Sequence, residues 1–88
     1  MELSAGCKAV LRRLLSQRRI GGKHIPEQIC LRWLKNLRKE EYRRTIKDWE
    51  WCIKEGLVLI KPKPGGRHVF LNPARVKEIK DFVSYEKW

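Results

Sequence analysis

The segment PEQICLRWLKNLRKEEYRRTIKDWEWCIKE spans residues 26–55 and contains no glycine and no proline after Pro26, so neither residue type marks a helix end within it. Its apolar side chains nevertheless form two helical stripes. The first stripe contains Ile29, Trp33 and Leu37, and the second contains Tyr42, Ile46, Trp49 and Ile53. At about 100° per residue the stripes point roughly 160° apart, and one straight helix would leave half of them in water. The pattern therefore predicts two helices, about 26–36 and 40–55.

The residues between the two stripes suit the end of one helix and the start of another. Asn36 can adopt the left-handed conformation that ends a helix. Glu40 and Glu41 fall in the first turn of the second helix, where the helix dipole favours anions. We therefore predict a helix-turn-helix arrangement whose second helix buries the stripe that begins at Tyr42.

Upstream of this pair, a first helix is predicted from Ser4, a suitable N-cap, to the glycine pair Gly21-Gly22. Its apolar positions at helical spacing are Cys7, Val10, Leu11, Leu14 and Leu15. Residues 23–25 form a short extended segment, because the residue before Pro26 is pushed toward β geometry. Pro26 itself suits the first turn of the following helix.

Downstream, Gly56 ends the third helix, and the apolar run 57–60 predicts a strand. The segment KPKPGGRH, residues 61–68, reverses the chain, and Gly65-Gly66 supplies the positive φ angles that a tight reversal needs. A return strand follows at 68–71, and Asn72-Pro73 begins a last helix at about 73–84. The similar segments GGKHI, 21–25, and GGRHV, 65–69, indicate two strands that could lie in one small sheet.

With 88 residues the chain is long enough for one domain, 1–88. The fold class is α+β, in the order helix-strand-helix-helix-strand-strand-helix with a small antiparallel sheet. There are 21 Lys and Arg residues against 10 Asp and Glu residues, and the net charge of +11 is spread along the chain. Such a surface favours a polyanionic partner.

The sequence gives little support to a cofactor, a metal or catalysis. Cys7, Cys30 and Cys52 lie in apolar helix positions, which favours reduced, buried thiols over a zinc site, because no two are closely paired. Gly22-Lys23 lacks the rest of a phosphate-binding loop, and His24 and His68 suit hydrogen-bonded strand residues better than acid-base groups. We find no apolar leader and no run of roughly 20 apolar residues that would span a membrane, so we expect a cytoplasmic protein that is not an enzyme.

The element order, and the pattern Trp49-x-x-Cys52-x-x-x-Gly56-Leu57-Val58, resemble the winged helix-turn-helix family of nucleic-acid-binding domains. The pattern is similar to the family's recognition helix running into the first wing strand. The resemblance implies a wing at about 57–71 and binding of double-stranded DNA. It also implies a possible homodimer, whose two reading helices would lie about 34 Å apart, one DNA turn.

The candidate DNA-binding residues are the cations of the third helix and of the wing. They are Arg38, Lys39, Arg43, Arg44 and Lys47 on the groove face, and Lys61, Lys63 and Arg67 on the wing. Such side chains neutralise phosphates, and arginine also reads guanine edges or a narrow minor groove. The alternatives are a solvated basic helix face and a hairpin whose lysines and prolines protect a sheet edge. Trp51 could contact the sugar-phosphate backbone, pack within the fold or belong to a subunit interface.

We expect a DNA-binding protein, plausibly a transcription regulator. The alternative is a winged-helix interaction module that docks on a protein in a transcription or replication assembly. It is favoured by the four basic and four acidic residues of 41–60, and by Phe82, Tyr85 and Trp88. RNA binding has weaker support, because the strands show no aromatic platform for unpaired bases.

Overall fold

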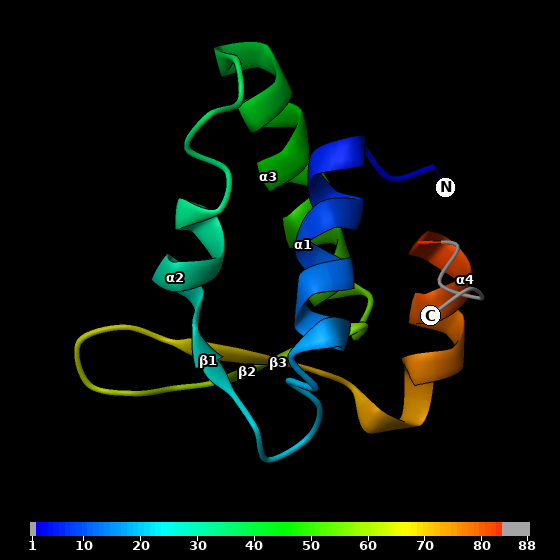
Figure 1. The fold of residues 1–88 in the computed structure, drawn as a ribbon. Coiled ribbons are helices and arrows are strands. Elements are labelled where there is room, and N and C mark those ends of the chain that lie inside the picture. The colour runs from blue at the N-terminus through cyan, green and yellow to red at the C-terminus, as the bar shows by residue number, and fades with distance from the viewer. Residues whose placement is uncertain (1, 84–88) are drawn as a thin grey trace.

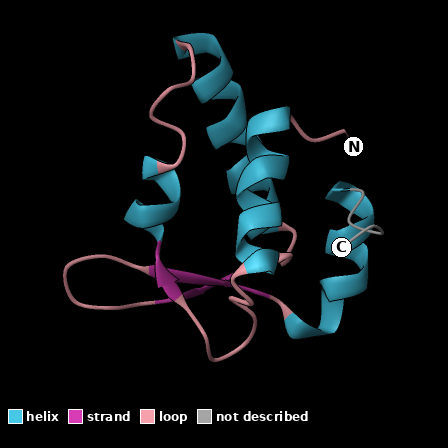
Figure 2. Ribbon diagram, in the orientation of Figure 1, coloured by secondary structure: helices cyan, strands magenta, loops and turns pink. Residues whose placement is uncertain are grey.

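The computed structural model describes residues 2–83, which form four α-helices and one three-stranded antiparallel sheet (Figures 1 and 2). In chain order the elements are α1 (Ala5–Ser16), β1 (Ile25–Pro26), α2 (Glu27–Arg32), α3 (Lys39–Lys54), β2 (Val58–Lys61), β3 (His68–Leu71), a 3₁₀ helix (Pro73–Arg75) and α4 (Val76–Val83). The predicted α+β class and element order are therefore confirmed. Residue 84, where the last helix was expected to end, lies outside the described residues, as do Tyr85 and Trp88.

The sheet has the order β1-β3-β2, with β3 in the centre. Ile25 of β1 lies opposite Val69 of β3, so the two similar segments GGKHI and GGRHV do supply neighbouring strands. The hairpin between β2 and β3 turns at Gly65 and Gly66, whose φ angles of 82° and 146° are unfavourable for any residue with a Cβ. We call residues 62–67 the β2–β3 loop; its tip extends beyond α2 (Figure 1).

Helix α1 occupies the centre of the core, packed against α3 and α4 and against one face of the sheet (Figure 1). Its predicted apolar positions are all buried: Cys7, Val10, Leu11, Leu14 and Leu15. The helix begins as predicted, because the Ser4 hydroxyl accepts a hydrogen bond from the Cys7 backbone N–H at 3.3 Å. Each buried leucine contributes about 1.5–3 kcal/mol to folding, so this face anchors the domain.

Helix α1 ends at Ser16, before the predicted stop at Gly21-Gly22. The reason is a Schellman turn: the N–H of Arg19 bonds the Leu14 carbonyl at 2.9 Å, and that of Arg18 bonds the Leu15 carbonyl at 3.0 Å. Arg18 takes the left-handed position of this turn, with φ of 55°. Glycine is the usual residue there, which is why the sequence did not show this helix end.

The chain bends between α2 and α3, as the two apolar stripes predicted, but α2 is shorter than expected. Residues beyond Arg32 form successive tight turns, in which the N–H of Leu34 bonds the Leu31 carbonyl and that of Leu37 bonds the Leu34 carbonyl, both at 3.1 Å. Asn36 does not adopt the left-handed conformation expected of it. Helix α3 begins at Lys39, and the Glu41 carboxylate accepts a hydrogen bond from the Arg38 N–H at 3.2 Å.

The buried faces of α2 and α3 differ from the predicted stripes. On α3 the buried residues are Thr45, Asp48, Trp49 and Cys52, and on α2 the buried residue is Cys30. The prediction is wrong for Ile29 and Tyr42, each 38% exposed, while Ile46 and Ile53 are only partly buried. Packing against α1 sets the rotation of α3 about its own axis, and so decides which face of α3 is buried.

The crossing of α1 and α3 is close and polar. A Cβ on Gly6 would lie 2.3 Å from the Thr45 hydroxyl oxygen, so only glycine lets the two helices approach this far. Asp48 is buried and accepts a hydrogen bond from the Ser4 backbone N–H at 2.8 Å. The start of α1 therefore satisfies the polar groups on the buried side of α3.

The three cysteines are free and buried, as predicted. Sγ of Cys7 and Sγ of Cys52 lie 3.9 Å apart across the α1–α3 contact. Within residues 2–83, no cluster of three or more His, Cys, Asp or Glu side chains is suited to hold a metal ion. In the same part of the chain no helix combines the length and the apolar character needed to cross a membrane.

Candidate nucleic-acid interface

The outer side of α3 carries a row of cations. At about 100° per residue, three basic residues and Glu50 lie opposite the buried Thr45 and Cys52. The basic residues are Arg43, Lys47 and Lys54, and all three are exposed. We call these four residues the outer face of α3. The row runs along the helix from Arg43 to Lys54, and Glu50 interrupts it.

The β2–β3 loop supplies a second set of cations. Lys61 ends β2, and Lys63 stands between Pro62 and Pro64, all of them exposed. The two prolines fix their own φ angles, which stiffens the arm on the side where it leaves β2. The two lysines are therefore held on a hairpin whose tip extends beyond α2 (Figure 1).

Arg67 links the end of this loop to both α2 and α3. Its guanidinium forms a bidentate pair with the Glu27 carboxylate, at 2.8 and 2.9 Å, and a further contact of 3.2 Å with Glu50. The indole N–H of Trp49 donates to the same Glu27 carboxylate at 2.8 Å. Glu27 thus joins the loop to a buried residue of α3, and Glu50 joins it to the outer face.

Both partners of this pair are held in their charged forms. Burial alone would raise the pKa of Glu27, but the hydrogen bonds from Arg67 and Trp49 outweigh it and lower the pKa below its usual value of 4.5. The hydrogen bond to Glu27 in turn raises the pKa of Arg67. The link between the loop and the helices therefore stays intact at neutral pH.

Two histidines meet at the base of the hairpin. Nδ1 of His24 and Nδ1 of His68 are 2.7 Å apart, so one ring N–H donates to the unprotonated nitrogen of the other. The pKa of His24 is lowered, first by burial and then by the positive charges of Lys61, His68 and Lys63. The sequence contained a signal for this contact, because the repeated Gly-Gly-basic-His pattern precedes two strands that pair with each other.

Seven of the eight predicted site residues lie in four places. Arg43 and Lys47 lie on the outer face of α3, and Lys61 and Lys63 lie on or beside the loop. Arg38 and Lys39 lie at the start of α3 next to Glu40 and Glu41, and Arg44 lines a hollow beside Ser4 and Leu37 on the α1 side of the helix. Of these seven, all are exposed, and none forms a salt bridge with another described residue.

Arg67 differs from the other predicted residues, because its charge is engaged by two carboxylates. The sequence did not reveal Glu27 and Glu50 as its partners, since they lie 40 and 17 positions away in the chain. Trp51 packs within the fold: its ring meets Phe82 of α4 edge to face, with centroids 5.8 Å apart.

Comparison of the chain with known protein families, with curated proteins and with solved structures finds no match.

Proposed function

We propose that the protein binds double-stranded DNA as a winged-helix domain. The outer face of α3 enters the major groove, and the β2–β3 loop acts as the wing, with its lysines on the neighbouring phosphates. The order of the elements and the order of the strands support this layout. Three buried, free cysteines favour a reducing, cytoplasmic location, where a transcription regulator would act.

One observation carries the proposal: the 3.2 Å contact between Arg67 and Glu50. It joins the end of the loop to the middle of the outer face, between Lys47 and Lys54. The two sets of exposed cations therefore belong to one continuous surface rather than to separate parts of the molecule. A polyanion that spans both sets gains from each phosphate it neutralises.

In this proposal Arg67 and Glu27 position the wing, while Arg43, Lys47, Lys61 and Lys63 contact DNA. Of these, arginine can form two hydrogen bonds with a guanine edge, and lysine neutralises a phosphate as a point charge. Arg43 is thus the residue assigned to base contact.

Fluorescence anisotropy of a labelled duplex across a salt series tests the proposal. With the three lysines each on one phosphate, log affinity should fall with log salt with a slope of about −3. Reversing the charges of Arg43 and Lys47 should abolish most of this binding, whereas K77E, on α4, should alter it little. Absence of salt-dependent binding at micromolar protein would refute the proposal, and preferential competition by structured RNA would redirect it to RNA.

A second candidate function is docking on another protein. It is favoured by Ile29 of α2 and Tyr42 of α3, two large apolar side chains that are 38% exposed. Isolated exposed apolar residues are common, so this observation is weaker than the link between the two sets of exposed cations. If docking is the function, I29S and Y42S should abolish capture of a protein partner, and R43E should not. If DNA binding is the function, R43E should abolish duplex binding, and I29S and Y42S should leave it unchanged.

A further inference from the structure

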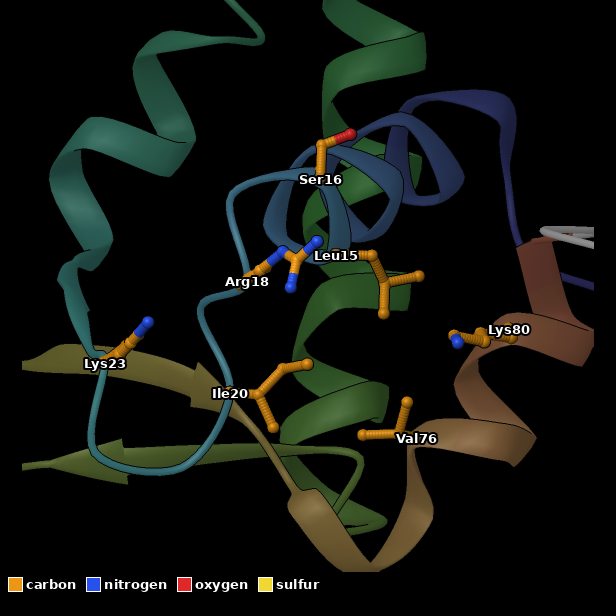
Figure 3. A pocket seen from close by; sticks show the side chains of 7 residues that line it. All are labelled: Leu15, Ser16, Arg18, Ile20, Lys23, Val76 and Lys80. Atoms are coloured by element: carbon orange, nitrogen blue, oxygen red, sulfur yellow. The ribbon is translucent and has the colours of Figure 1, made fainter. Parts of the chain in front are cut away.

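A cavity of about 550 Å³ lies where the end of α1, the chain leading to β1, and α4 meet (Figure 3). Its volume is within the range of about 300–1,000 Å³ that is usual for small-molecule sites. None of the residues that line it belongs to α3 or to the β2–β3 loop. The cavity is therefore separate from the surface proposed to bind DNA.

The lining combines two kinds of side chain. Leu15, Ile20 and Val76 form an apolar part, and Arg18, Lys23 and Lys80 contribute three cations. In Figure 3 Arg18 and Lys23 come from the chain after α1, whereas Lys80 reaches from α4 toward the space beside Leu15 and Val76. No acidic side chain is among the described residues that line the cavity.

The backbone at Arg18 is strained in a way that places its side chain here. Both α1 and α3 end in Schellman turns, and α3 uses Gly56, with φ of 78°, at the left-handed position. The equivalent position of α1 is Arg18, although the left-handed conformation is unfavourable for a residue with a Cβ. A strained arginine where glycine would be more stable indicates a role for its guanidinium.

The wall that carries Arg18 is held in place by the sheet. The backbone of Leu71 in β3 donates to the Arg19 carbonyl at 2.8 Å and accepts from the Gly21 N–H at 3.2 Å. Ile20 lies between these two hydrogen bonds and forms a bridge with Leu71. The shape of this side of the cavity is thus fixed before a ligand arrives, which reduces the entropy lost on binding.

We propose that this cavity binds a small organic anion that carries one carboxylate, sulfonate or phosphate on an apolar body. The apolar body packs on Leu15, Ile20 and Val76, and the anionic group meets Arg18. The apolar part distinguishes this site from a general phosphate-binding surface, which would not need it. The proposal does not depend on DNA binding.

Octanoate is a suitable probe, with octan-1-ol and acetate as its matched controls. Titration of the ¹⁵N-labelled protein with octanoate should move the amide resonances of residues 15–23 and 76–80. Octan-1-ol lacks the charge and acetate lacks the apolar body, so each should bind at least tenfold more weakly. Equal binding of octan-1-ol, or shifts confined to α3 and the β2–β3 loop, would overturn the proposal.

The variant R18G removes the cation and relieves the strained backbone, so it should fold at least as stably as the parent chain. It should weaken octanoate binding about tenfold, the loss expected for one charge-assisted hydrogen bond. K77Q removes the same charge from an exposed position of α4 outside the lining and should bind as the parent does. If R18G and K77Q weaken binding equally, only net charge matters and the site is disproved.

Discussion

Glu27 and Arg67 form a bidentate ion pair that joins α2 to the end of the β2–β3 loop, with N–O distances of 2.8 and 2.9 Å. The carboxylate is largely buried and also accepts the indole N–H of Trp49, whereas the guanidinium remains partly exposed. Removing the Glu27 carboxylate would take an acceptor from both the Arg67 guanidinium and the Trp49 indole N–H. This pair should therefore matter more than an ordinary surface salt bridge.

We predict that E27Q lowers the free energy of unfolding by about 1–2 kcal/mol at pH 7. For a domain of this size the melting temperature should fall by roughly 4–8 °C per kcal/mol. Thermal unfolding followed by circular dichroism measures the change. E40Q, in the exposed first turn of α3, is the matched control and should cost less than about 0.5 kcal/mol. Equal effects of the two substitutions would show that the pair is not special.

The same pair gives a pH dependence with a definite sign. The pKa of Glu27 is lowered in the folded protein, so its contribution is present above the ordinary value of 4.5 and is lost as pH falls through the folded pKa. The difference in unfolding free energy between the parent chain and E27Q should therefore shrink on acidification from pH 7 to pH 3. Urea titrations at several pH values measure it, and a difference that grows in acid would contradict the assignment.

His24 should report on the charge around the hairpin. Its pKa is lowered by burial and then by nearby cations that include Lys61 and Lys63, so its imidazole should titrate below 6.5 in NMR spectra. K63Q removes one of these charges and should move the pKa of His24 upward, whereas K77Q should not. If phosphates neutralise the same cations in a DNA complex, adding duplex should also raise this pKa. An unchanged pKa at saturating duplex would place the DNA elsewhere.

The close crossing of α1 and α3 predicts a steric effect. In G6A the new methyl group would lie 2.3 Å from the Thr45 hydroxyl oxygen, so we expect a net loss of about 1–2 kcal/mol despite the better helix propensity of alanine. Adding T45A should recover part of this loss, because it removes the clashing atoms. G22A is the control: a Cβ there meets no atom within 4 Å, and its unfolding free energy should hardly change.

Two kinds of information set the limit of prediction from this sequence. The bend before α3, the hairpin and the start of the 3₁₀ helix that leads into α4 follow from local signals: the change of apolar phase, Gly65-Gly66 and Asn72-Pro73. The last α-helix itself begins at Val76, three residues later than predicted. The buried face of α3 does not, because Asp48 is polar and is buried only where the start of α1 supplies its hydrogen bond. Hydrophobic spacing predicts that Tyr42 is buried and Asp48 is exposed. The hydrogen bond from Ser4 reverses this, so Asp48 is buried and Tyr42 is exposed.

The partners of Arg67 illustrate the same limit for the candidate site. Charge and turn composition correctly placed Arg67 at the end of a basic hairpin. That its guanidinium binds Glu27 and Glu50 depends on how β3, α2 and α3 meet in space, and no short-range pattern records that arrangement.

Neighbouring arginines of α3 provide the sharpest test of the proposed DNA surface. Arg43 lies on the outer face, whereas Arg44 lines the hollow beside Ser4 and Leu37. R43Q and R44Q remove the same charge one residue apart, so non-specific attraction should fall equally in both. If the outer face enters the groove, R43Q should lower duplex affinity by about 1–3 kcal/mol more than R44Q does, because R43Q alone removes a base contact. Anisotropy titrations at three or more salt concentrations separate the two effects, and a larger loss for R44Q would put the α1 side of α3 against the DNA.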